Sequence, residues 1–434
     1  MSPKTRVLAV LMFIGLGWPV PISAAEDNSS SLSAAMHVIA AADLQDCVNY
    51  LADDAMEGRE AGSRGGRAAG DFVASFLQQL KCKGAGVNGR FDQPFDGTCR
   101  NMLGLMEGSD PRLKQQIVVV SAHYDHVGYG TYRNSYGPVG HIHNGADDNA
   151  SGVSGVLKLA DAFATLKPRP KRSLLFAFFD AEEKGLLGSK YWAAHPTVPL
   201  AQVVFDVNID MIGRLRQERL EVHGWRSGFG IRRLLADQNT AGDVWMDFYW
   251  AVKADSDQYS FFERGIPMVL LSTGEHAQYH RPSDKANLIN NQGMQQVDRL
   301  AFQLVYHLAQ QPETIAFRAA AGRESSATER GLFLAHGLPP EGSPMRVGIS
   351  WQVDDAEPGT VILVGVMPDS PAARAGLQPG DRIIQLAGSN FADDAAFAAK
   401  IRNLPGPIEV LIERGGRLYR VNIPLGQQQL KRAA

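Results

Sequence analysis

Four short apolar runs stand out in the first two thirds of the chain. They are residues 117–122, 174–179, 203–209 and 267–271. Continuous apolar runs of this length are typical of strands buried on both faces, as in a parallel sheet. Helical periodicity fills the gaps between them, most clearly at residues 153–166 and 185–194. This alternation predicts an α/β fold whose mainly parallel, mixed sheet is sandwiched by helices.

The flanks of this pattern set the limits of the first domain. Residues 44–81 show helical periodicity interrupted by a Gly-, Ser- and Arg-rich loop at 57–67, and a helix at 294–310 ends before Pro312. We therefore expect one domain over residues 40–312. Residues 313–340 are rich in Ala, Arg, Glu and Ser, which predicts either a terminal helix or a linker. Residues 341–428 are β-rich with one helix at 393–402, the size of a small separate domain.

Composition excludes two classes of partner. Hydrophobic residues make up 44% and charged residues 21% of the chain, and the formal net charge is -3. These values are ordinary for a globular protein, and they give no basis for binding to nucleic acid or to an anionic membrane.

The N-terminus has the order of a secretory signal. Lys4 and Arg6 precede an apolar run at residues 7–17, two prolines follow, and Ser23, Ala24 and Ala25 are small. This order predicts a signal peptide over residues 1–25, cleaved after Ala24 or Ala25. The alternative is a membrane anchor, but the run is much shorter than the ~20 residues that a span requires. We therefore expect an exported protein, periplasmic or secreted, without a membrane span.

The chain has three cysteines, Cys47, Cys82 and Cys99. Export permits a disulfide, and the short turn-rich loop between Cys82 and Cys99 makes them the favoured pair. Three unpaired thiols are the alternative. No cysteine lies near the motifs described next, so none is expected to bind a metal.

Acidic and histidine residues follow each apolar run. His123 and Asp125 follow the first run, Glu182 and Glu183 the second, Asp210 the third, and His280 the fourth after a short loop. Asp147 and Asp148 stand before the helix at 153–166. Ligand sites of open α/β sheets form outside the carboxyl ends of the strands, so these side chains should meet at one edge.

Imidazoles and carboxylates without cysteine favour zinc in an open, catalytic site. Two ions that share a carboxylate can activate a water between them. His123 with Asp210, His280 with Glu183, and a bridging Asp147 fill this requirement. Asp125 then orients His123, and Glu182 takes the proton from the water.

Each of these signals has a structural alternative. Glu182 and Glu183 would also favour a helix N-terminus, and Asp147 and Asp148 would also cap a helix. Asp210 is harder to explain structurally, because an unpaired carboxylate in an apolar strand is costly to bury. The convergence of all five groups on one edge is what favours the metal site.

Five segments of the chain closely resemble the co-catalytic di-zinc aminopeptidase family, which is related to glutamate carboxypeptidases and glutaminyl cyclases. They are residues 122–128 (AHYDHVG), 144–152 (NGADDNASG), 179–189 (FDAEEKGLLGS), 208–212 (NIDMI) and 279–284 (YHRPSD). The early loop at residues 56–67 also resembles the family's lead-in, so the resemblance covers roughly residues 44–310.

The resemblance implies two Zn²⁺ ions, with Co²⁺ or Mn²⁺ as alternatives, held as above by His123, Asp210, Glu183, His280 and a bridging Asp147. It implies Glu182 as the general base, Asp125 as the residue that orients His123, and a cis peptide at Asp147–Asp148. The chain departs from the family at Gln258, where a histidine is common, which puts substrate preference in question. Four histidines without a matching role are expected at the rim: His126, His141, His143 and His276.

The C-terminal module resembles a bacterial-type PDZ domain. The match lies in residues 346–349 (RVGI) and 370–384 (SPAARAGLQPGDRII). By this resemblance the backbone of Arg346, Val347, Gly348 and Ile349 holds the carboxylate of a peptide or protein C-terminus, which adds as a strand. The alternative is a module that only packs on the first domain.

Together these features predict an exported exopeptidase that removes N-terminal residues from peptides, using a metal-bridged hydroxide with Glu182 as general base. The aminopeptidase direction comes from the resemblance, since the residues themselves indicate only metal-assisted acyl hydrolysis. Two alternatives are a glutaminyl-cyclase-like acyltransferase and a non-catalytic, receptor-like binding protein. A complete ligand set with a water-activating Glu182 favours hydrolysis over both.

Overall fold

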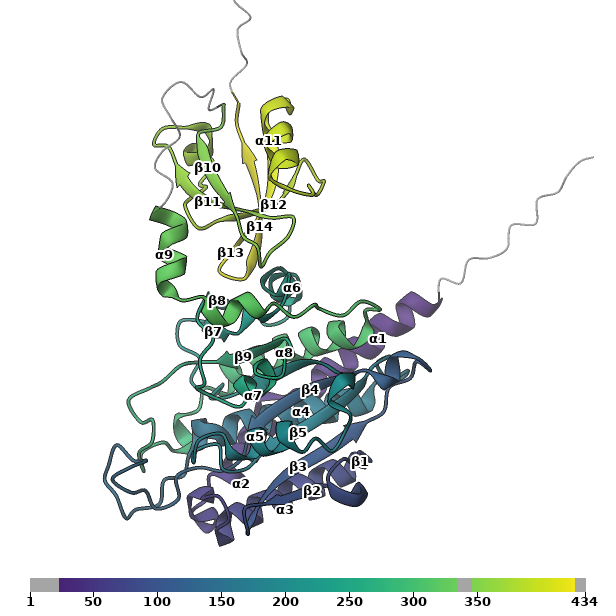
Figure 1. The fold of residues 1–434 in the computed structure, drawn as a ribbon, viewed down its shortest axis with the longest axis vertical. Helices are drawn as coiled ribbons and strands as arrows, with labels where there is room; N and C mark the ends of the chain where they lie inside the picture. Colours follow the sequence, from purple (N-terminus) through teal and green to yellow (C-terminus); the bar gives the residue numbers. More distant parts are fainter. Residues whose placement is uncertain (1–22, 335–345, 426–434) are drawn as a thin grey trace, which may run out of the picture.

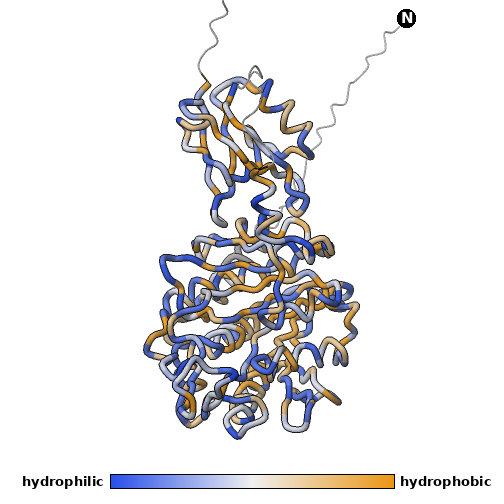
Figure 2. Tube along the Cα trace, turned by 60° about the vertical axis from the view of Figure 1, so that its left-hand side comes forward, coloured by the Kyte–Doolittle hydropathy of each residue, from blue (hydrophilic) through white to orange (hydrophobic). Residues whose placement is uncertain are grey.

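The computed structural model describes residues 23–334 and 346–425, which form a large body with a smaller one stacked on it (Figure 1). The predicted signal peptide therefore lies outside the described residues except for Ser23, Ala24 and Ala25, which begin helix α1 (Ser23–Val38). Figure 2 shows apolar stretches running through the interior of the larger body. None of the helices in the described ranges has the length and apolar character that a membrane span requires.

Within residues 23–334, nine strands form one mixed sheet. The order is β1-β3-β5-β4-β6-β9-β7-β8, with β2 paired to β3. The strands are β1 (Lys83–Gly84), β2 (Asp92–Phe95), β3 (Cys99–Met106), β4 (Ile117–His123), β5 (Ser173–Phe179), β6 (Val203–Ile209), β7 (Arg219–His223), β8 (Trp245–Phe248) and β9 (Met268–Ser272). The four central strands β5, β4, β6 and β9 are parallel, as predicted from their apolar runs.

Strand β4 shows why these runs are apolar throughout. Val118 and Val120 belong to the core on one face of the sheet, while Ile117 and Val119 belong to the core on the other. Successive side chains of a strand point to opposite faces, so a strand covered on both sides needs apolar residues at every position. The prediction of a sheet sandwiched by helices is confirmed.

Seven helices of residues 23–334 cover the two faces (Figure 1). The first face carries α1, α2 (Ala41–Leu51), α3 (Arg64–Gln79), α4 (Gly152–Thr165) and α8 (Asn291–Gln310), and the second carries α5 (Leu187–Ala194) and α7 (Gln258–Phe262). Helix α1 precedes residue 40, where we placed the start of the domain. Its Ala35 and the following Ile39 are nevertheless buried in the same core.

Residues 346–425 form a five-stranded antiparallel sheet with its own core. The elements are β10 (Ile349–Val353), β11 (Val361–Val366), α10 (Pro371–Arg374), β12 (Arg382–Leu386), α11 (Asp394–Asn403), β13 (Ile408–Arg414) and β14 (Arg417–Ile423). The predicted helix at 393–402 corresponds to α11, whose N-cap Asp393 accepts a hydrogen bond from Ala396 N. Strand β10 pairs only with β11 among the described strands, so its other edge is free.

The smaller body packs on the larger one, along helix α6 (Ile231–Gln238) and strand β8. Met246 N donates to Gly415 O at 2.8 Å, in the turn between β13 and β14. A Cβ atom at Gly415 would lie 2.3 Å from the Trp245 ring, and its φ is +57°, so this turn requires glycine. The small domain therefore packs on the larger body, and its binding of a peptide C-terminus stays a prediction.

Buried ion pairs accompany this contact. Arg226 is bonded to Asp354 at 2.7 Å and to Glu324 at 2.5 Å. Arg232 of α6 is bonded to Glu413 of β13 at 2.8 Å. Glu324 lies in the predicted linker, of which residues 319–334 form η8 (Ala319–Arg323) and α9 (Ser326–Leu334). Glu324 thus ties the described part of that segment to Arg226 of the larger body.

All three cysteines are unpaired in the structure. The favoured Cys82–Cys99 disulfide is not formed, and the alternative of three free thiols describes the molecule. Burial raises the pKa of the thiol to about 11 for Cys47 and Cys82 alike, which makes both poor nucleophiles.

Candidate metal centre

The parallel strands deliver the predicted side chains to one edge of the sheet. His123 is the last residue of β4, Asp210 directly follows β6, and Glu183 lies a few residues after β5. His280 lies in the loop that follows β9. The carboxyl ends of parallel strands share an edge, so this convergence follows from the topology.

One group of potential ligands contains His123, Asp148 and Asp210. His123 Nε2 lies 3.2 Å from Asp210 Oδ1 and 3.4 Å from Asp148 Oδ1. The candidate ligand atoms of the group lie within 4.8 Å of one another. One imidazole and two carboxylates are suited to a divalent ion such as zinc.

A second group contains His126, Asp148, Glu183 and His280. His280 Nε2 lies 3.0 Å from both Asp148 Oδ2 and Glu183 Oε2. His126 Nδ1 lies 2.8 Å from Glu183 Oε1 and 3.6 Å from Asp148 Oδ2. Asp148 therefore belongs to both groups, with one carboxylate oxygen turned to each.

Two properties of these groups fit a pair of cations. His280 Nε2 is buried and forms no hydrogen bond with any described residue, although two carboxylate oxygens surround it. Burial alone lowers the pKa of His280, but its contacts with Asp148 and Glu183 raise it to about 11. A buried imidazole nitrogen enclosed by two carboxylate oxygens is a donor set of the kind that holds a divalent ion.

The structure corrects the assignment of the shared carboxylate from Asp147 to Asp148. Asp147 is not in either group; its Oδ1 accepts hydrogen bonds from Gly213 N at 2.6 Å and Ser151 Oγ at 3.0 Å. Its Oδ2 lies 3.2 Å from His276 Nε2. Both aspartates lie in η4 (Ala146–Ser151), where Asp148 has an extended backbone (φ −102°, ψ 97°), so the two neighbours project to different sides.

The cis peptide is also displaced by one residue from its predicted place. It joins Asp148 to Asn149 rather than Asp147 to Asp148. In the prediction and in the structure alike, the cis bond follows the aspartate that is assigned as the shared ligand.

Asp284 holds this segment in place and was not singled out by its sequence. Its Oδ2 accepts hydrogen bonds from Asp147 N at 2.8 Å and from Asp148 N at 3.2 Å, and Arg214 Nη2 lies 3.2 Å from Oδ1. The only available signal was its position at the end of the segment 279–284. A fully buried carboxylate thus fixes the backbone of the shared ligand.

Asp125 contacts two parts of the site. Its Oδ1 lies 3.7 Å from His123 Nδ1, the position expected of a residue that orients this imidazole. Its two oxygens also accept hydrogen bonds from Glu182 N at 3.0 Å and Glu183 N at 3.3 Å. Asp125 thereby links the end of β4 to the loop after β5.

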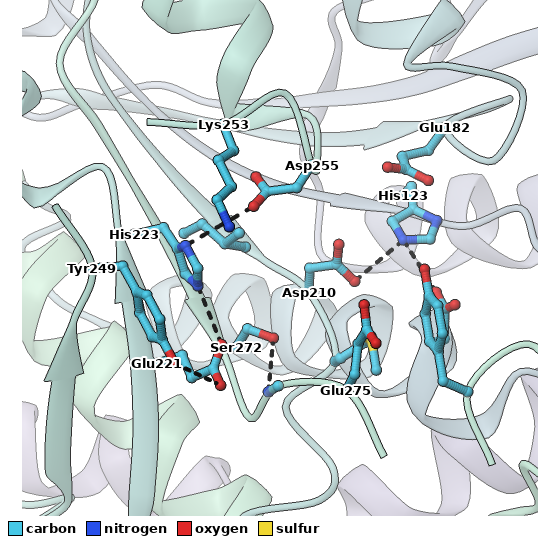
Figure 3. A pocket seen from close by; sticks show the side chains of 15 residues that line it. His123, Glu182, Asp210, Glu221, His223, Tyr249, Lys253, Asp255, Ser272 and Glu275 are labelled. Atoms are coloured by element: carbon cyan, nitrogen blue, oxygen red, sulfur yellow. Dashed lines mark hydrogen bonds and ion pairs between the residues drawn. The ribbon is translucent and has the colours of Figure 1, made fainter. Parts of the chain in front are cut away.

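Glu182 lies beside the metal groups without belonging to them. It lines one pocket together with His123, Asp148 and Asp210, and points toward the His123 side of it (Figure 3). Burial, reinforced by the neighbouring carboxylates of Glu183, Asp257 and Asp210, raises the pKa of Glu182 well above its usual range. A carboxylate in such surroundings is a suitable proton acceptor.

The pocket has a volume of about 320 Å³ and extends away from the metal groups. Met211, Leu270 and the aromatic ring of Tyr279 are among its lining residues. Its far side is polar, and the residues there are Glu221, His223, Tyr249, Lys253, Asp255 and Ser272 (Figure 3). A substrate with its reacting bond at the metal groups would place one side chain in this space.

Of the four histidines expected at the rim, only His141 is exposed. His126 belongs to the second metal group and is fully enclosed, so the expectation is wrong for this residue. His143 Nε2 is hydrogen bonded to Ser135 Oγ at 2.6 Å, and His276 contacts Asp147. The position of His126 at the end of the segment His-Tyr-Asp-His was the signal available in the sequence.

The early loop contributes a buried arginine. The Arg59 guanidinium donates to the carbonyl oxygens of Asn144 and Gly145 at 2.7 and 2.8 Å, and to those of Leu51 and Tyr124 at 2.7 and 3.0 Å. These bonds tie the loop to the two segments that carry His123 and Asp148. The resemblance at residues 56–67 therefore has a structural basis.

The predicted carboxylate-binding segment of the small domain precedes and enters β10. Gly348 has a φ of +82°, Val347 and Ile349 are buried, and Arg346 Nη1 donates to Arg402 O at 2.9 Å. Trp351 of β10 donates through Nε1 to Asp394 of α11 at 2.5 Å. The indole therefore connects the free-edge strand to the helix that would form the other wall of a peptide groove.

Family models match both parts of the chain. Residues 101–305 match the model described as Peptidase family M28, and residues 362–414 match the model of a PDZ domain. Aminopeptidase YwaD of Bacillus subtilis is 27% identical over 231 residues, which cover 50% of this chain and 47% of YwaD. Leupeptin-inactivating enzyme 1 of Streptomyces exfoliatus is 32% identical over 114 residues, 26% of this chain and 22% of that protein. The chain spans about half or less of these relatives.

Solved structures share the fold of the larger body. The LapA aminopeptidase of Legionella pneumophila is 21% identical with a TM-score of 0.54, covering 70% of this chain and 81% of that one. BSAP, a zinc aminopeptidase from Bacillus subtilis, is 16% identical with a TM-score of 0.51, covering 64% of this chain and 98% of that one. These likenesses confirm the zinc-exopeptidase type of fold.

Proposed function

We propose that this chain, which matches the peptidase family M28 model at residues 101–305 and the PDZ model at residues 362–414, is an exported di-zinc aminopeptidase. The observation that carries the proposal is Asp148, whose two carboxylate oxygens face separate groups of histidine and carboxylate side chains. The names of the relatives YwaD, LapA and BSAP support the aminopeptidase direction.

Zinc would be held by His123, Asp148 and Asp210 on one side and by Asp148, Glu183 and His280 on the other. When bound, the two ions supply an activated water and polarise the carbonyl group of the substrate. His126 lies against Glu183 and would fix the orientation of that ligand, as carboxylate–histidine contacts do at other metal sites.

Glu182 would move the proton during hydrolysis. Its carboxylate accepts a proton from the attacking water, and the same group then returns it to the departing amine as the peptide C–N bond breaks. Asp125 supports this step through the hydrogen bond from Glu182 N, which fixes the backbone that carries the base. The products are a free amino acid and a peptide shortened by one residue.

The PDZ domain would bind the C-terminus of a peptide or protein between β10 and α11. The free edge of β10 supports addition of a strand, and Gly348 lies where the terminal carboxylate would meet backbone N–H groups. Lys4, Arg6 and the apolar run at 7–17 support export to the periplasm or the outside of the cell.

A direct test uses the chain from residue 26 onward, loaded with zinc and assayed on amino-acid amides and short peptides. We expect release of the free N-terminal amino acid, loss of activity with a chelator, and recovery on addition of Zn²⁺. N-acetylated versions of the same peptides serve as matched controls and should resist cleavage. Formation of pyroglutamate without release of amino acids would favour an acyltransferase, and a zinc-free, inactive protein would favour a binding role.

A further inference from the structure

The far side of the substrate pocket contains a chain of three linked polar side chains (Figure 3). His223 Nε2 lies 3.3 Å from Glu221 Oε2, and His223 Nδ1 lies 4.0 Å from Asp255 Oδ2. Tyr249 stacks on the His223 ring, with centroids 4.5 Å apart, and its hydroxyl donates to Glu221 Oε1 at 3.3 Å. The metal groups and this chain lie on opposite sides of one space.

His223 has one ring nitrogen that is paired with a carboxylate and one that has no hydrogen-bond partner among the described residues. Its Nε2 faces a carboxylate oxygen, which only accepts hydrogen bonds, so Nε2 carries the hydrogen. His223 is only 8% exposed, and Nδ1 forms no hydrogen bond with any residue in the described ranges. The Asp255 carboxylate, 4.0 Å from this unpaired nitrogen, offers an acceptor to a ligand that donates.

The surroundings of Glu221 hold its carboxylate in place. A Cβ atom at Gly274 would lie 2.4 Å from Glu221 Oε1, so the glycine leaves the space that the carboxylate occupies. Arg216 Nη2 donates to Thr273 O at 2.9 Å and Glu275 O at 3.1 Å, which fixes the backbone around Gly274. The His223 hydrogen bond, with smaller contributions from Tyr249 and Arg216, lowers the pKa of Glu221, so this carboxylate is charged.

Asp255 is positioned by the residue that departs from the family. Gln258 Nε2 donates to Asp255 Oδ1 at 2.8 Å, while Gln258 Oε1 accepts from Asn208 at 3.2 Å. An amide side chain can bridge a donor and an acceptor in this way at any pH. Gln258, at the position where the family commonly has histidine, therefore affects the pocket rather than the metal groups.

The charges on this side of the pocket are predominantly negative. Glu221 and Asp255 line it, and Lys253 is the only lysine or arginine among the described residues that line the pocket. Lys253 and Asp255 are both exposed, whereas Glu221 is half-buried and His223 is buried. A ligand group that reaches the buried end of the pocket consequently meets the Glu221 carboxylate, which accepts hydrogen bonds.

We propose that this polar end of the pocket binds the cationic side chain of the substrate, so that the enzyme prefers N-terminal lysine or arginine over leucine. The inference rests on the proposed aminopeptidase function, because the N-terminal residue carries the carbonyl that is attacked at the metal groups. The ammonium or guanidinium group donates to the Asp255 carboxylate and lies beside Glu221. Charge-assisted hydrogen bonds of this kind discriminate strongly against substrates that lack the donor.

The test compares kcat/KM for lysyl, arginyl, leucyl and glutamyl amides with the zinc-loaded enzyme. We expect the two basic amides to be cleaved at least about tenfold more efficiently than leucyl amide. Glu221→Gln and Asp255→Asn should each lower the ratio of kcat/KM for the basic amides to that for leucyl amide by about tenfold to a hundredfold. Glu263→Gln, which removes an exposed carboxylate outside the pocket, is the matched control and should change nothing.

Lys253→Met distinguishes a preference for basic substrates from the opposite preference, for acidic substrates. We expect the variant to keep or increase its preference for basic amides. A wild-type preference for glutamyl amide that disappears in Lys253→Met would overturn the proposal, as would equal cleavage of leucyl and lysyl amides.

Binding gives a second readout that does not need turnover. Lysinamide should raise the midpoint of thermal unfolding more than norleucinamide, which has the same chain length without the ammonium group, and Glu221→Gln should abolish the difference. Equal stabilisation by both would contradict the inference. Failure to cleave any amide would contradict the proposed function, whereas the binding comparison would still decide this inference.

Discussion

Asp148 Oδ2 lies 3.0 Å from His280 Nε2, whereas the carboxylate of the adjacent Asp147 points to Ser151 and His276 instead. Asp148→Asn should therefore reduce bound zinc from two ions toward one or none and remove activity, because each ion loses a charged ligand. Asp147→Asn should retain both ions and lose stability instead. Metal analysis of the two purified variants checks this, and an Asp147→Asn protein that lost its zinc while Asp148→Asn kept it would reverse the assignment.

Glu182→Gln should separate chemistry from metal binding. The amide preserves the shape of the side chain but cannot accept the proton, so kcat should fall by about a hundredfold to ten thousandfold with zinc content unchanged. Steady-state kinetics and metal analysis on one preparation provide both numbers. Normal turnover in this variant would remove Glu182 from the mechanism.

Asp284→Ala should weaken metal binding although Asp284 is not in either metal group. The change leaves the amides of Asp147 and Asp148 without their acceptor, so the shared ligand loses its fixed orientation. Zinc affinity should fall by about tenfold to a hundredfold. Competition with a chromogenic chelator measures it. Asp284→Asn retains one acceptor oxygen and should lie between wild type and Asp284→Ala; identical affinities in all three would argue against a positioning role.

Arg232→Met should destabilise the docked arrangement of the two domains. Glu413 would remain buried without its partner, which costs about 3 kcal/mol or more at similar sites. Urea denaturation measures the loss. Arg420→Met is the matched control, because its pair with Glu409 is exposed and should contribute less than about 1 kcal/mol. Equal effects of the two substitutions would mean that the domain contact does not depend on the Arg232 pair.

Glu357 should make stability depend on pH. It accepts hydrogen bonds from Arg232 N and Arg233 N, and burial raises its pKa to about 7. The folded protein thus keeps this proton at pH values where the unfolded chain has released it, so stability falls as pH rises from about 4.5 to 7. The unfolding free energy relative to Glu357→Gln should drop by on the order of 3 kcal/mol across this window. If the unfolding free energies of wild type and Glu357→Gln changed with pH in parallel, the Glu357 carboxyl group would have its ordinary pKa.

Much of the fold could be predicted because its central strands have an unambiguous pattern. β4, β5, β6 and β9 are buried on both faces, and no other element type combines such short length with such continuous apolarity. Strands β7 and β8 were not predicted, because charged and half-buried residues such as Arg219 and Asp247 interrupt their pattern. The docking of the small domain was left open because it depends on pairs such as Arg226–Asp354, which are 128 residues apart.

The site was less predictable than the fold for a local reason. Residue type and strand position are enough to bring His123, Glu183, Asp210 and His280 to one edge. They do not distinguish Asp147 from Asp148, which are neighbours of the same type in an irregular segment. Only the backbone angles of η4 decide which carboxylate faces the histidines. The same limit applies to His126, whose direction depends on the turn after β4.

The most direct test of the account is X-ray diffraction from crystals of the zinc-loaded protein, recorded at the zinc absorption edge. We expect two anomalous peaks, each with an Asp148 oxygen at about 2.0–2.2 Å. One should also be bound by His123 and Asp210, and the other by Glu183 and His280. A single peak, or two peaks joined by Asp147 with Asp148 turned away, would contradict the central claim that Asp148 holds two ions together.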